Sequence, residues 1–266
     1  MSDLLKAVIL SIVEGITEFL PISSTGHLIL VNHWIEFQGS FAKSFDVIIQ
    51  FGAILSVLVL YWDKLYPFSK RKSILKKRDT ITLWCKVVTA FIPAAVLGAL
   101  FHDLIEEKLF NSITVAVALV VGGILILILE KGEKRPKITH IGQISYKMAF
   151  VIGFFQCLAM IPGTSRSAAT IIGAMALGTS REVAAEFSFF LAIPTMAGAT
   201  AYSLLKKGIY ITSSEWITLL VGVVLSFIVA LVVISFFMEY IKKKDFKVFG
   251  YYRIVLGALI LFYFYR

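Results

Sequence analysis

Four ionisable side chains stand inside long apolar stretches of this sequence: Glu14, Glu18, His27 and Arg166. An ionisable group at membrane depth is expensive to bury, so by default it serves a function. Glu14 and Glu18 are four residues apart and therefore share one face of a helix. Arginine holds phosphate oxygens in a planar fork, histidine moves protons, and carboxylates hold hard divalent cations. Together these residue types indicate chemistry on a phosphate group.

A polar elbow interrupts each of the two stretches that carry these groups. Residues 4–35 contain the elbow PISSTG, and residues 144–178 contain the elbow PGTS. Each arm beside an elbow is too short to cross a bilayer core of about 30 Å comfortably. Both stretches are therefore predicted to be re-entrant helical hairpins. Their elbows must be buried in protein or in a wet cavity, because lipid cannot satisfy a non-helical backbone.

Helix caps are predicted directly after both elbows. Ser23 or Ser24 can cap the first new helix, and Thr164 or Ser165 can cap the second. A helix start presents unpaired N–H groups and about half a positive charge. Two such starts facing each other form an anion site, for which phosphate is the natural guest.

Ten residues around the elbows are candidates for the site. The chemistry itself is assigned to Glu14, Glu18, Ser24, His27 and Arg166. Phosphate contacts, or capping alone, are assigned to Ser23, Thr25, Thr164, Ser165 and Ser167. Three nucleophiles stay open: Ser24 activated by His27 three residues on, His27 itself, and water.

The two carboxylates need a counter-charge, because they repel each other and would also repel a phosphate. One of them could be protonated, Arg166 could neutralise them, or a divalent cation could bridge carboxylate and phosphate oxygens. We favour a mixture of the second and third solutions. The expected cofactor is therefore Mg²⁺ or Ca²⁺, held by Glu14 and Glu18.

The composition decides what kind of protein surrounds these groups. The chain is 58% hydrophobic and 16% charged, with a mean hydropathy of +0.86. A soluble domain usually has about 25% charged residues. This excludes an ordinary water-soluble globule, a disordered chain and, with two cysteines, a disulfide scaffold. The net charge of +9 lies in short loops and therefore indicates membrane topology, not a nucleic-acid partner.

Six further apolar stretches are long enough to cross a bilayer. They are Val47–Trp62, Ile81–Phe101, Leu109–Leu129, Phe187–Leu205, Trp216–Met238 and Val248–Tyr265. The last of them carries one charge, Arg253, near its start. The predicted fold is an all-α polytopic membrane protein with six transmembrane helices and two re-entrant hairpins.

Basic residues in the loops set the predicted orientation. Residues 64–78, 130–147 and 239–248 hold 16 of the 26 Lys and Arg residues. Six crossings place these three loops on one face, which the positive-inside rule makes cytoplasmic. Both termini are then expected outside, and the first hairpin enters from the outer face.

The order of elements also predicts an inverted repeat within a single domain, 1–266. A hairpin followed by three crossings occurs twice, in residues 1–130 and 140–266, and an odd number of crossings inverts the second copy. The first elbow aligns with the second, Phe45 aligns with Phe187, and Glu14 aligns with Gln156.

The residues from Glu14 to His27 read EGITEFLPISSTGH, and residues 162–167 read PGTSRS. These two motifs resemble the signatures of the undecaprenyl-diphosphatase family, which is linked to bacitracin resistance, and the likeness covers essentially the whole chain. It implies hydrolysis of undecaprenyl diphosphate to the monophosphate, which recycles the cell-wall carrier lipid at the outer face of the bacterial cytoplasmic membrane. Carried onto matching positions, it implicates the same five residues: Glu14, Glu18, Ser24, His27 and Arg166.

Two other functions fit parts of the pattern. A secondary transporter or lipid translocase would also use inverted repeats and hairpins at the midplane. An anion channel fits less well, because paired carboxylates oppose anion passage. The expected partners are a polyprenyl diphosphate substrate and membrane lipids, and a homodimer is compatible with the sequence.

Overall fold

The computed structural model describes residues 1–37, 39–131, 135–207 and 212–264. Residues 132–134, part of the second basic loop, lie outside the described residues. Within these ranges the regular elements are helices, apart from one isolated bridge between Ile138 and Thr179. This agrees with an all-α polytopic protein.

The helices follow the predicted order along the chain. The first half contains α1 (Asp3–Thr17), α2 (Ser24–Ile35), α3 (Ser40–Leu60), the short α4 (Trp62–Leu65), α5 (Ile74–Leu109) and α6 (Ser112–Leu129). The second half contains η1 (Ile141–Gln143), α7 (Tyr146–Cys157), η2 (Leu158–Met160), α8 (Arg166–Ala176), α9 (Arg181–Lys207), α10 (Ser213–Lys243) and α11 (Lys247–Phe264).

Five of the described helices are long and apolar enough to cross a membrane: α5, α6, α9, α10 and α11. They correspond to the last five predicted crossings, although α6 begins at Ser112 and not at residue 109, and residue 265 lies outside the described residues. The first predicted crossing, 47–62, falls mainly in α3, whose apolar part, Ser44–Leu60, is shorter than the other spans. Asp46 lies inside that part, so α3 reads less clearly as a crossing.

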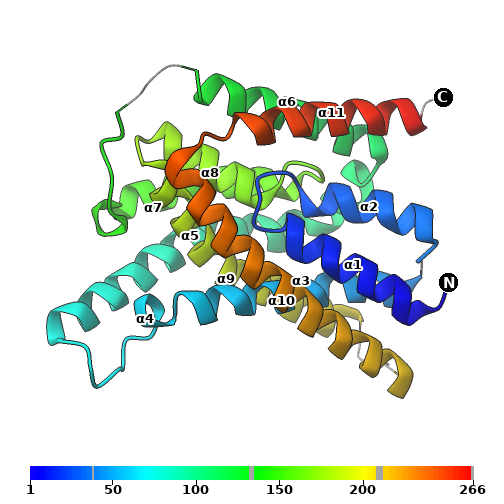
Figure 1. Cartoon of the computed structure of the whole chain (residues 1–266), viewed down its shortest axis with the longest axis horizontal. Coiled ribbons are helices and arrows are strands. Elements are labelled where there is room, and N and C mark those ends of the chain that lie inside the picture. The colour runs from blue at the N-terminus through cyan, green and yellow to red at the C-terminus, as the bar shows by residue number, and fades with distance from the viewer. Residues whose placement is uncertain (38, 132–134, 208–211, 265–266) are drawn as a thin grey trace.

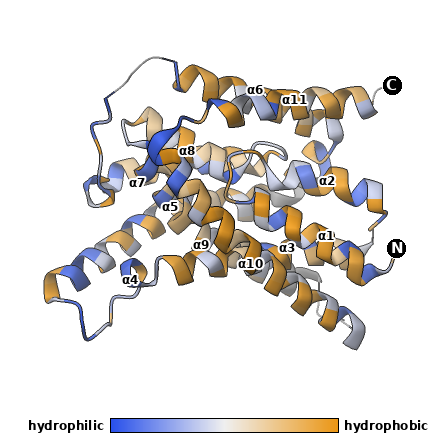
Figure 2. Cartoon of the chain, in the orientation of Figure 1, coloured by the Kyte–Doolittle hydropathy of each residue, from blue (hydrophilic) through white to orange (hydrophobic). Residues whose placement is uncertain are grey.

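The ends of the bundle differ in charge. Figure 1 shows the ends of the chain on one side, at the right, and the junctions α4–α5, α6–α7 and α10–α11 on the other, at the left. Those three junctions are the basic segments named above. In Figure 2 the helices between the two ends are coloured mostly as hydrophobic, and the segments at the left contain many hydrophilic residues. The described basic segments therefore share one end of the molecule.

The two halves use matching contacts. In the first, α1 packs against α10, and in the second, α7 packs against α5. Helices α6 and α11, the last of each half, pack against each other along their lengths, and α3 contacts α9. Each hairpin therefore leans on a long helix from the other half, which brings the two elbows towards one another.

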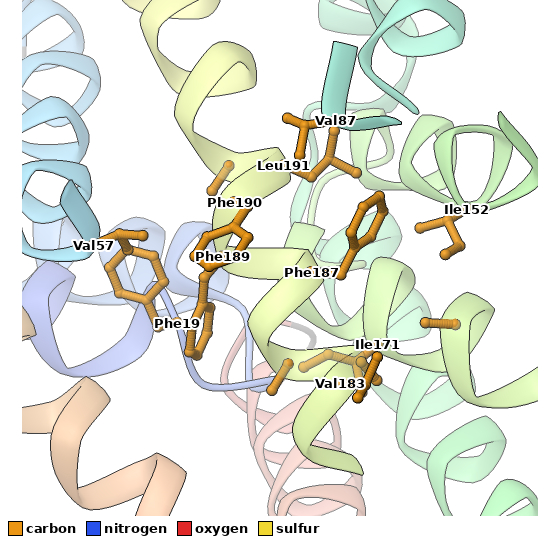
Figure 3. Packing of buried hydrophobic residues seen from close by; sticks show 14 of the residues in the cluster. Phe19, Val57, Val87, Ile152, Ile171, Val183, Phe187, Phe189, Phe190 and Leu191 are labelled. Carbon is orange, nitrogen blue, oxygen red and sulfur yellow. The ribbon is translucent and has the colours of Figure 1, made fainter. Parts of the chain in front are cut away.

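Helix α9 is the centre of the core. In its most apolar stretch of 18 residues, 67% is buried inside the protein, against 28–33% in the corresponding stretches of the other four spans. Phe187, Phe189 and Phe190 of α9 are fully buried. Figure 3 shows Phe189 beside Phe19, two residues before the first elbow, and the two rings lie edge-on with centroids 5.3 Å apart. This packing fixes the elbow against the central helix.

Candidate active site between the two elbows

Both helices that follow an elbow begin in the same way. Ser23 caps α2 by accepting a hydrogen bond from the Gly26 N–H, and Ser165 caps α8 by accepting one from the Ala168 N–H. Both serines have positive φ angles, 75° and 69°, which are uncommon outside glycine. Of the two caps considered for each helix, the structure selects Ser23 and Ser165. Strained backbone of this kind persists where the surroundings hold it in place.

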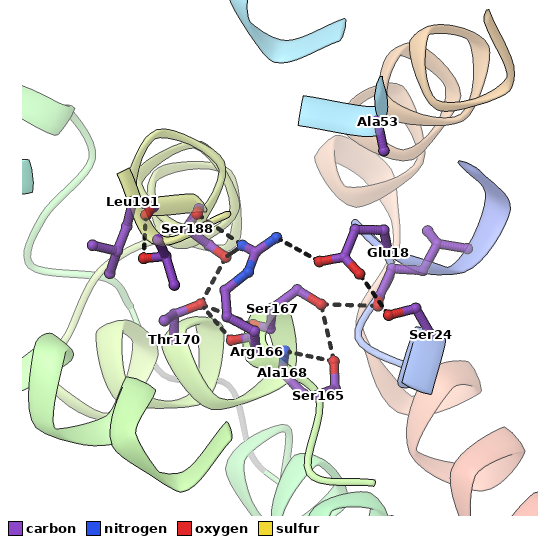
Figure 4. A network of polar contacts seen from close by, with 12 residues as sticks. Glu18, Ser24, Ala53, Ser165, Arg166, Ser167, Ala168, Thr170, Ser188 and Leu191 are labelled. Atoms are coloured by element: carbon purple, nitrogen blue, oxygen red, sulfur yellow. Dashed lines mark hydrogen bonds and ion pairs between the residues drawn. The ribbon is translucent and has the colours of Figure 1, made fainter. Parts of the chain in front are cut away.

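Glu18 joins the two elbows. Its Oε1 accepts a hydrogen bond from Nη2 of Arg166 at 3.1 Å, and its Oε2 accepts one from the Ser24 hydroxyl at 2.5 Å. Figure 4 shows this line of contacts running from α8 to the start of α2. The Glu18 and Arg166 side chains are only 6% and 10% exposed. Their pairing supports the expectation that Arg166 neutralises a carboxylate.

Arg166 is held on its other side by α9. Its Nη1 donates to both the carbonyl oxygen and the hydroxyl of Ser188, at 2.9 and 3.2 Å. Thr170, one turn further along α8, hydrogen bonds to the same Ser188 hydroxyl at 2.7 Å. Nε of Arg166 is buried and has no partner among the described residues. Three of the five N–H groups of the guanidinium are therefore used, which leaves the Nε–H and one Nη2–H without a partner among the described residues.

A second set of bonds ties the elbows by hydroxyl groups. Ser167 donates to the Leu20 carbonyl oxygen of the first elbow at 2.9 Å, and its hydroxyl lies 3.0 Å from that of Ser165. Thr25 is half-buried in the first turn of α2. The backbone carbonyl oxygen of Thr164 accepts a hydrogen bond from Arg253 of α11. The predicted phosphate-contacting hydroxyls thus lie at or beside the two helix starts.

The His27 ring makes its two hydrogen-bond contacts outside the Glu18–Arg166 network. Its Nδ1 lies 2.7 Å from the Ser23 carbonyl oxygen, and its Nε2 lies 2.6 Å from the Tyr252 hydroxyl of α11. The Ser24 hydroxyl donates to Glu18 and not to His27, so the activation of Ser24 by His27 stays a prediction. Residues three apart on a helix are neighbours, but here the first turns towards α1 and the second towards α11.

Glu14 is the unsatisfied member of the site. It is fully buried, and both of its carboxylate oxygens lack a hydrogen-bond partner among the described residues. Its carboxylate interacts electrostatically with three charged side chains: Glu18, Asp46 and Arg166. Asp46 accepts a hydrogen bond from Asn32 at 2.7 Å. A buried carboxylate without a partner is costly, so this position calls for a cation, a proton or water.

The donor set at Glu14 and Glu18 fits a divalent cation only in part. In the part of the chain that the structure describes, no three His, Cys, Asp or Glu side chains cluster to hold a metal by themselves. Mg²⁺, however, is commonly bound by one or two carboxylates together with substrate phosphates. Two hard carboxylates, one of them unpartnered, match that requirement.

Arg253 of α11 is the residue that sequence reasoning missed. It is fully buried and donates to the carbonyl oxygens of Pro21 in the first elbow and of Gly163 and Thr164 in the second, at 3.0–3.3 Å. It also reaches two carbonyl oxygens of α6. A lone arginine in an apolar span was itself a signal for a buried role. Ser188, by contrast, gave no such signal.

Two glycines make room for these contacts. A Cβ at Gly122 would lie 2.3 Å from Nη2 of Arg253, and a Cβ at Gly163 would lie 2.4 Å from the Val115 carbonyl oxygen. Gly163 also has a φ of +91°, which side chains rarely adopt. The second elbow therefore lies directly against α6, with Arg253 across its backbone.

Known proteins match this chain along almost its whole length. The family described as bacitracin resistance protein BacA matches residues 7–259, a range that includes both elbows and Arg253. The chain belongs to this family. It is 59% identical to undecaprenyl-diphosphatase 1 of Clostridioides difficile over 99% of this chain and 97% of the relative. It is 52% identical to the undecaprenyl-diphosphatase of Acetivibrio thermocellus, over 99% and 98%, and 52% identical to that of Enterococcus faecalis, over 97% and 96%. The family assignment inferred from the two BacA motifs is therefore confirmed.

Proposed function

We propose that this protein is an undecaprenyl-diphosphatase of the bacterial cytoplasmic membrane. It hydrolyses undecaprenyl diphosphate to undecaprenyl phosphate and inorganic phosphate, which recycles the lipid carrier for peptidoglycan and other cell-wall polymers and confers bacitracin resistance. The names of its relatives support this activity. The observation that carries it structurally is the contact between Glu18 and Arg166 at the start of α8. Because Glu18 also accepts a hydrogen bond from Ser24 at the start of α2, this carboxylate joins two helix starts at one buried polar site.

In this proposal Arg166 binds the terminal phosphate. Phosphoryl transfer depends mainly on positioning and on stabilising charge. The free Nε and a neighbouring Nη of Arg166 form a fork that suits two phosphate oxygens. The candidates for holding the remaining oxygens lie at or beside the two helix starts: Ser23, Thr25, Thr164, Ser165 and Ser167.

The contacts of Ser24 favour it as the nucleophile over His27 and water. Its hydroxyl already donates to a carboxylate oxygen of Glu18, which is placed to accept the proton. The Ser24 oxygen would form a bond to the terminal phosphorus while the bond to the bridging oxygen breaks, releasing undecaprenyl phosphate. Water would then hydrolyse the phosphoserine and release inorganic phosphate.

A divalent cation belongs to the same proposal. Glu14 and Glu18 would hold Mg²⁺ or Ca²⁺, and the bound ion would supply positive charge to the phosphate oxygens. The unpartnered carboxylate of Glu14 supports this assignment.

The membrane arrangement proposed for this activity has six crossings and two re-entrant hairpins. Helix α3 is taken as the sixth crossing, and the hairpins are α1–α2 and α7–α8. Supporting this, α1 and α2 have 15 and 12 residues and α7 and α8 have 12 and 11, so each is about 16 to 23 Å long and shorter than the membrane core. The paired contacts of the two halves and their serine caps support inverted repeats. The basic end is taken as cytoplasmic, which leaves both termini and the opening of the site on the outer face.

Hydrolysis by the purified protein tests the proposal. Phosphate release from undecaprenyl diphosphate is measured in detergent, with and without a chelator, for the wild type, Glu18→Ala, His27→Ala and Arg166→Ala. We expect release by the wild type and strong loss in Glu18→Ala and Arg166→Ala. Absence of release by a folded wild type supplied with Mg²⁺ or Ca²⁺ would contradict the proposal and favour a lipid translocase.

A further inference from the structure

Tyr252 makes the closest contact to the imidazole of His27. The two residues come from α11 and α2, far apart in the chain. The Tyr252 hydroxyl lies 2.6 Å from Nε2 of His27, and the rings are nearly parallel, with an interplanar angle of 5° and centroids 5.6 Å apart.

The other hydrogen bond of His27 fixes its tautomer. Nδ1 lies 2.7 Å from the Ser23 carbonyl oxygen, which can only accept a hydrogen bond. The neutral ring therefore carries its hydrogen on Nδ1 and its lone pair on Nε2. The Tyr252 hydroxyl must then donate to Nε2. This assignment follows from the hydrogen-bond network around the ring.

Both ring nitrogens of His27 are hydrogen-bonded in this arrangement, so neither is free to bind another group. A general base or a nucleophile needs the lone pair of Nε2, and an imidazolium that binds phosphate needs a hydrogen on Nε2 pointing at the ligand. Each of these roles requires the Tyr252 hydroxyl to leave. We infer that Tyr252 is a positioning residue that latches His27 in the resting enzyme. The phosphate of the lipid diphosphate displaces the Tyr252 hydroxyl while Nε2 takes up a proton from solvent, and the N–H formed there donates to the phosphate.

The surroundings of the two residues permit this exchange. Tyr252 is 44% exposed, and its hydroxyl has His27 as its one hydrogen-bond partner among the described residues. The next residue, Arg253, is fully buried and bonded to both elbows. The phenol can therefore swing aside while the backbone of α11 and the elbows stay in place. The Ser23 carbonyl keeps the imidazole oriented for the incoming phosphate.

This inference rests on the proposed function, and Tyr252→Phe tests it. The substitution keeps the ring and removes only the hydroxyl that competes with phosphate. A neutral hydrogen bond lost by the resting state corresponds to roughly a two- to tenfold effect on binding. We expect the KM for undecaprenyl diphosphate to fall by that factor with kcat changed less than twofold, and inorganic phosphate to inhibit at a correspondingly lower concentration. Tyr251→Phe, which removes an exposed hydroxyl one residue away, is the matched control and should change neither parameter.

Three results would overturn the latch. A fall in kcat with unchanged KM would place Tyr252 in a reaction step. Unchanged kinetics would make the contact incidental. A fall in KM of the same size in a His27→Gln background would show that the effect does not pass through the imidazole.

A measurement on the unmodified chain covers the case in which Tyr252→Phe does not fold. Histidine labelled with ¹⁵N is incorporated, and the Nε2 signal of His27 is assigned from its loss in His27→Gln. Inorganic phosphate should shift this signal in the wild type as the phenol is replaced, and a signal that does not respond at saturating phosphate contradicts the latch. If the wild type binds phosphate but releases none from the lipid, the proposed function fails while the latch can still be judged.

Discussion

The Glu18 carboxylate and the Arg166 guanidinium are 148 residues apart in the chain and meet at 3.1 Å between the two elbows. Each is held by a second contact on its own side, to Ser24 and to Ser188 respectively. Breaking a buried ion pair by removing one partner usually costs about 3 to 5 kcal/mol, because a charge is left uncompensated. In the proposed mechanism a phosphate binds the unpartnered Nε–H of Arg166 while the contact with Glu18 persists, so the pair holds the site ready without filling it.

Arg166→Lys tests whether the guanidinium acts as a fork. Lysine keeps the positive charge but offers a single ammonium, which cannot hold Glu18, Ser188 and a phosphate at once. We expect kcat/KM for undecaprenyl diphosphate to fall roughly ten- to a hundredfold, with the protein still folded in detergent. Lys64→Arg, at the basic end of the bundle, serves as the control and should be neutral. Activity of Arg166→Lys close to the wild type would contradict the fork.

Arg253→Met tests the tie between the elbows. The change removes the donors to the carbonyl oxygens of Pro21, Gly163 and Thr164. Each buried carbonyl left unsatisfied costs about 1 to 3 kcal/mol. We therefore expect a lower midpoint of thermal unfolding in detergent and a loss of hydrolysis that exceeds the loss of folded protein. Lys247→Met, at the exposed start of the same helix, is the control, and an Arg253→Met protein with normal stability and activity would remove Arg253 from the site.

Gly122→Ala examines the same tie from the opposite helix. An added Cβ at Gly122 would lie 2.3 Å from Nη2 of Arg253, so the guanidinium would have to shift. We expect a milder form of the Arg253→Met defect in both hydrolysis and thermal unfolding. Gly142→Ala is the matched control, because a Cβ there meets nothing within 4 Å. Equal behaviour of the two variants would show that Arg253 has room to move without consequence.

Local features of this site could be predicted from sequence. The elbows, the serine caps and the start of α8 at Arg166 depend on residues within a few positions of each other, and those positions carry recognisable turn and capping chemistry. The five longest spans follow from hydropathy alone. The pairing of Arg166 with a carboxylate was expected because an unpaired charge at membrane depth is too costly.

Partners supplied by distant helices could not be predicted in the same way. Ser188 and Tyr252 reach the site only because α9 and α11 pack against the hairpins, and neither residue type is unusual in an apolar helix. The partner of the His27 side chain could not be predicted for a related reason. Helical spacing gives the face of a residue, but the neighbouring helix, here α11, decides which group its side chain meets.

The identity of the nucleophile can be read from a trapped phosphoenzyme. The Ser24 hydroxyl donates its hydrogen bond to the Glu18 carboxylate, which can accept the proton. The lone pair on Nε2 of His27 instead accepts a hydrogen bond from Tyr252. We therefore expect the phosphate on Ser24. Phosphoserine survives acid and phosphohistidine does not. Radiolabelled substrate is quenched in acid, and an acid-stable label is expected in the wild type and absent from Ser24→Ala. An acid-labile label would assign the role to His27, and no label under trapping conditions would favour direct attack by water.

Glu14→Gln tests the proposed cation site. Glutamine keeps the size of the side chain but removes the charge that would attract a divalent ion. Both oxygens of the Glu14 carboxylate lack a hydrogen-bond partner in the part of the chain that the structure describes. Chelation should abolish hydrolysis by the wild type, and added Mg²⁺ or Ca²⁺ should restore it. For Glu14→Gln we expect the cation concentration needed for half-maximal activity to rise roughly tenfold or more, since two charged carboxylates become one. Asp3→Asn, an exposed acidic residue on the same helix, should leave that concentration unchanged. If the wild type keeps full activity in chelator, Glu14 holds a proton or water in place of a metal, and Glu14→Gln should then alter kcat without any dependence on added cation.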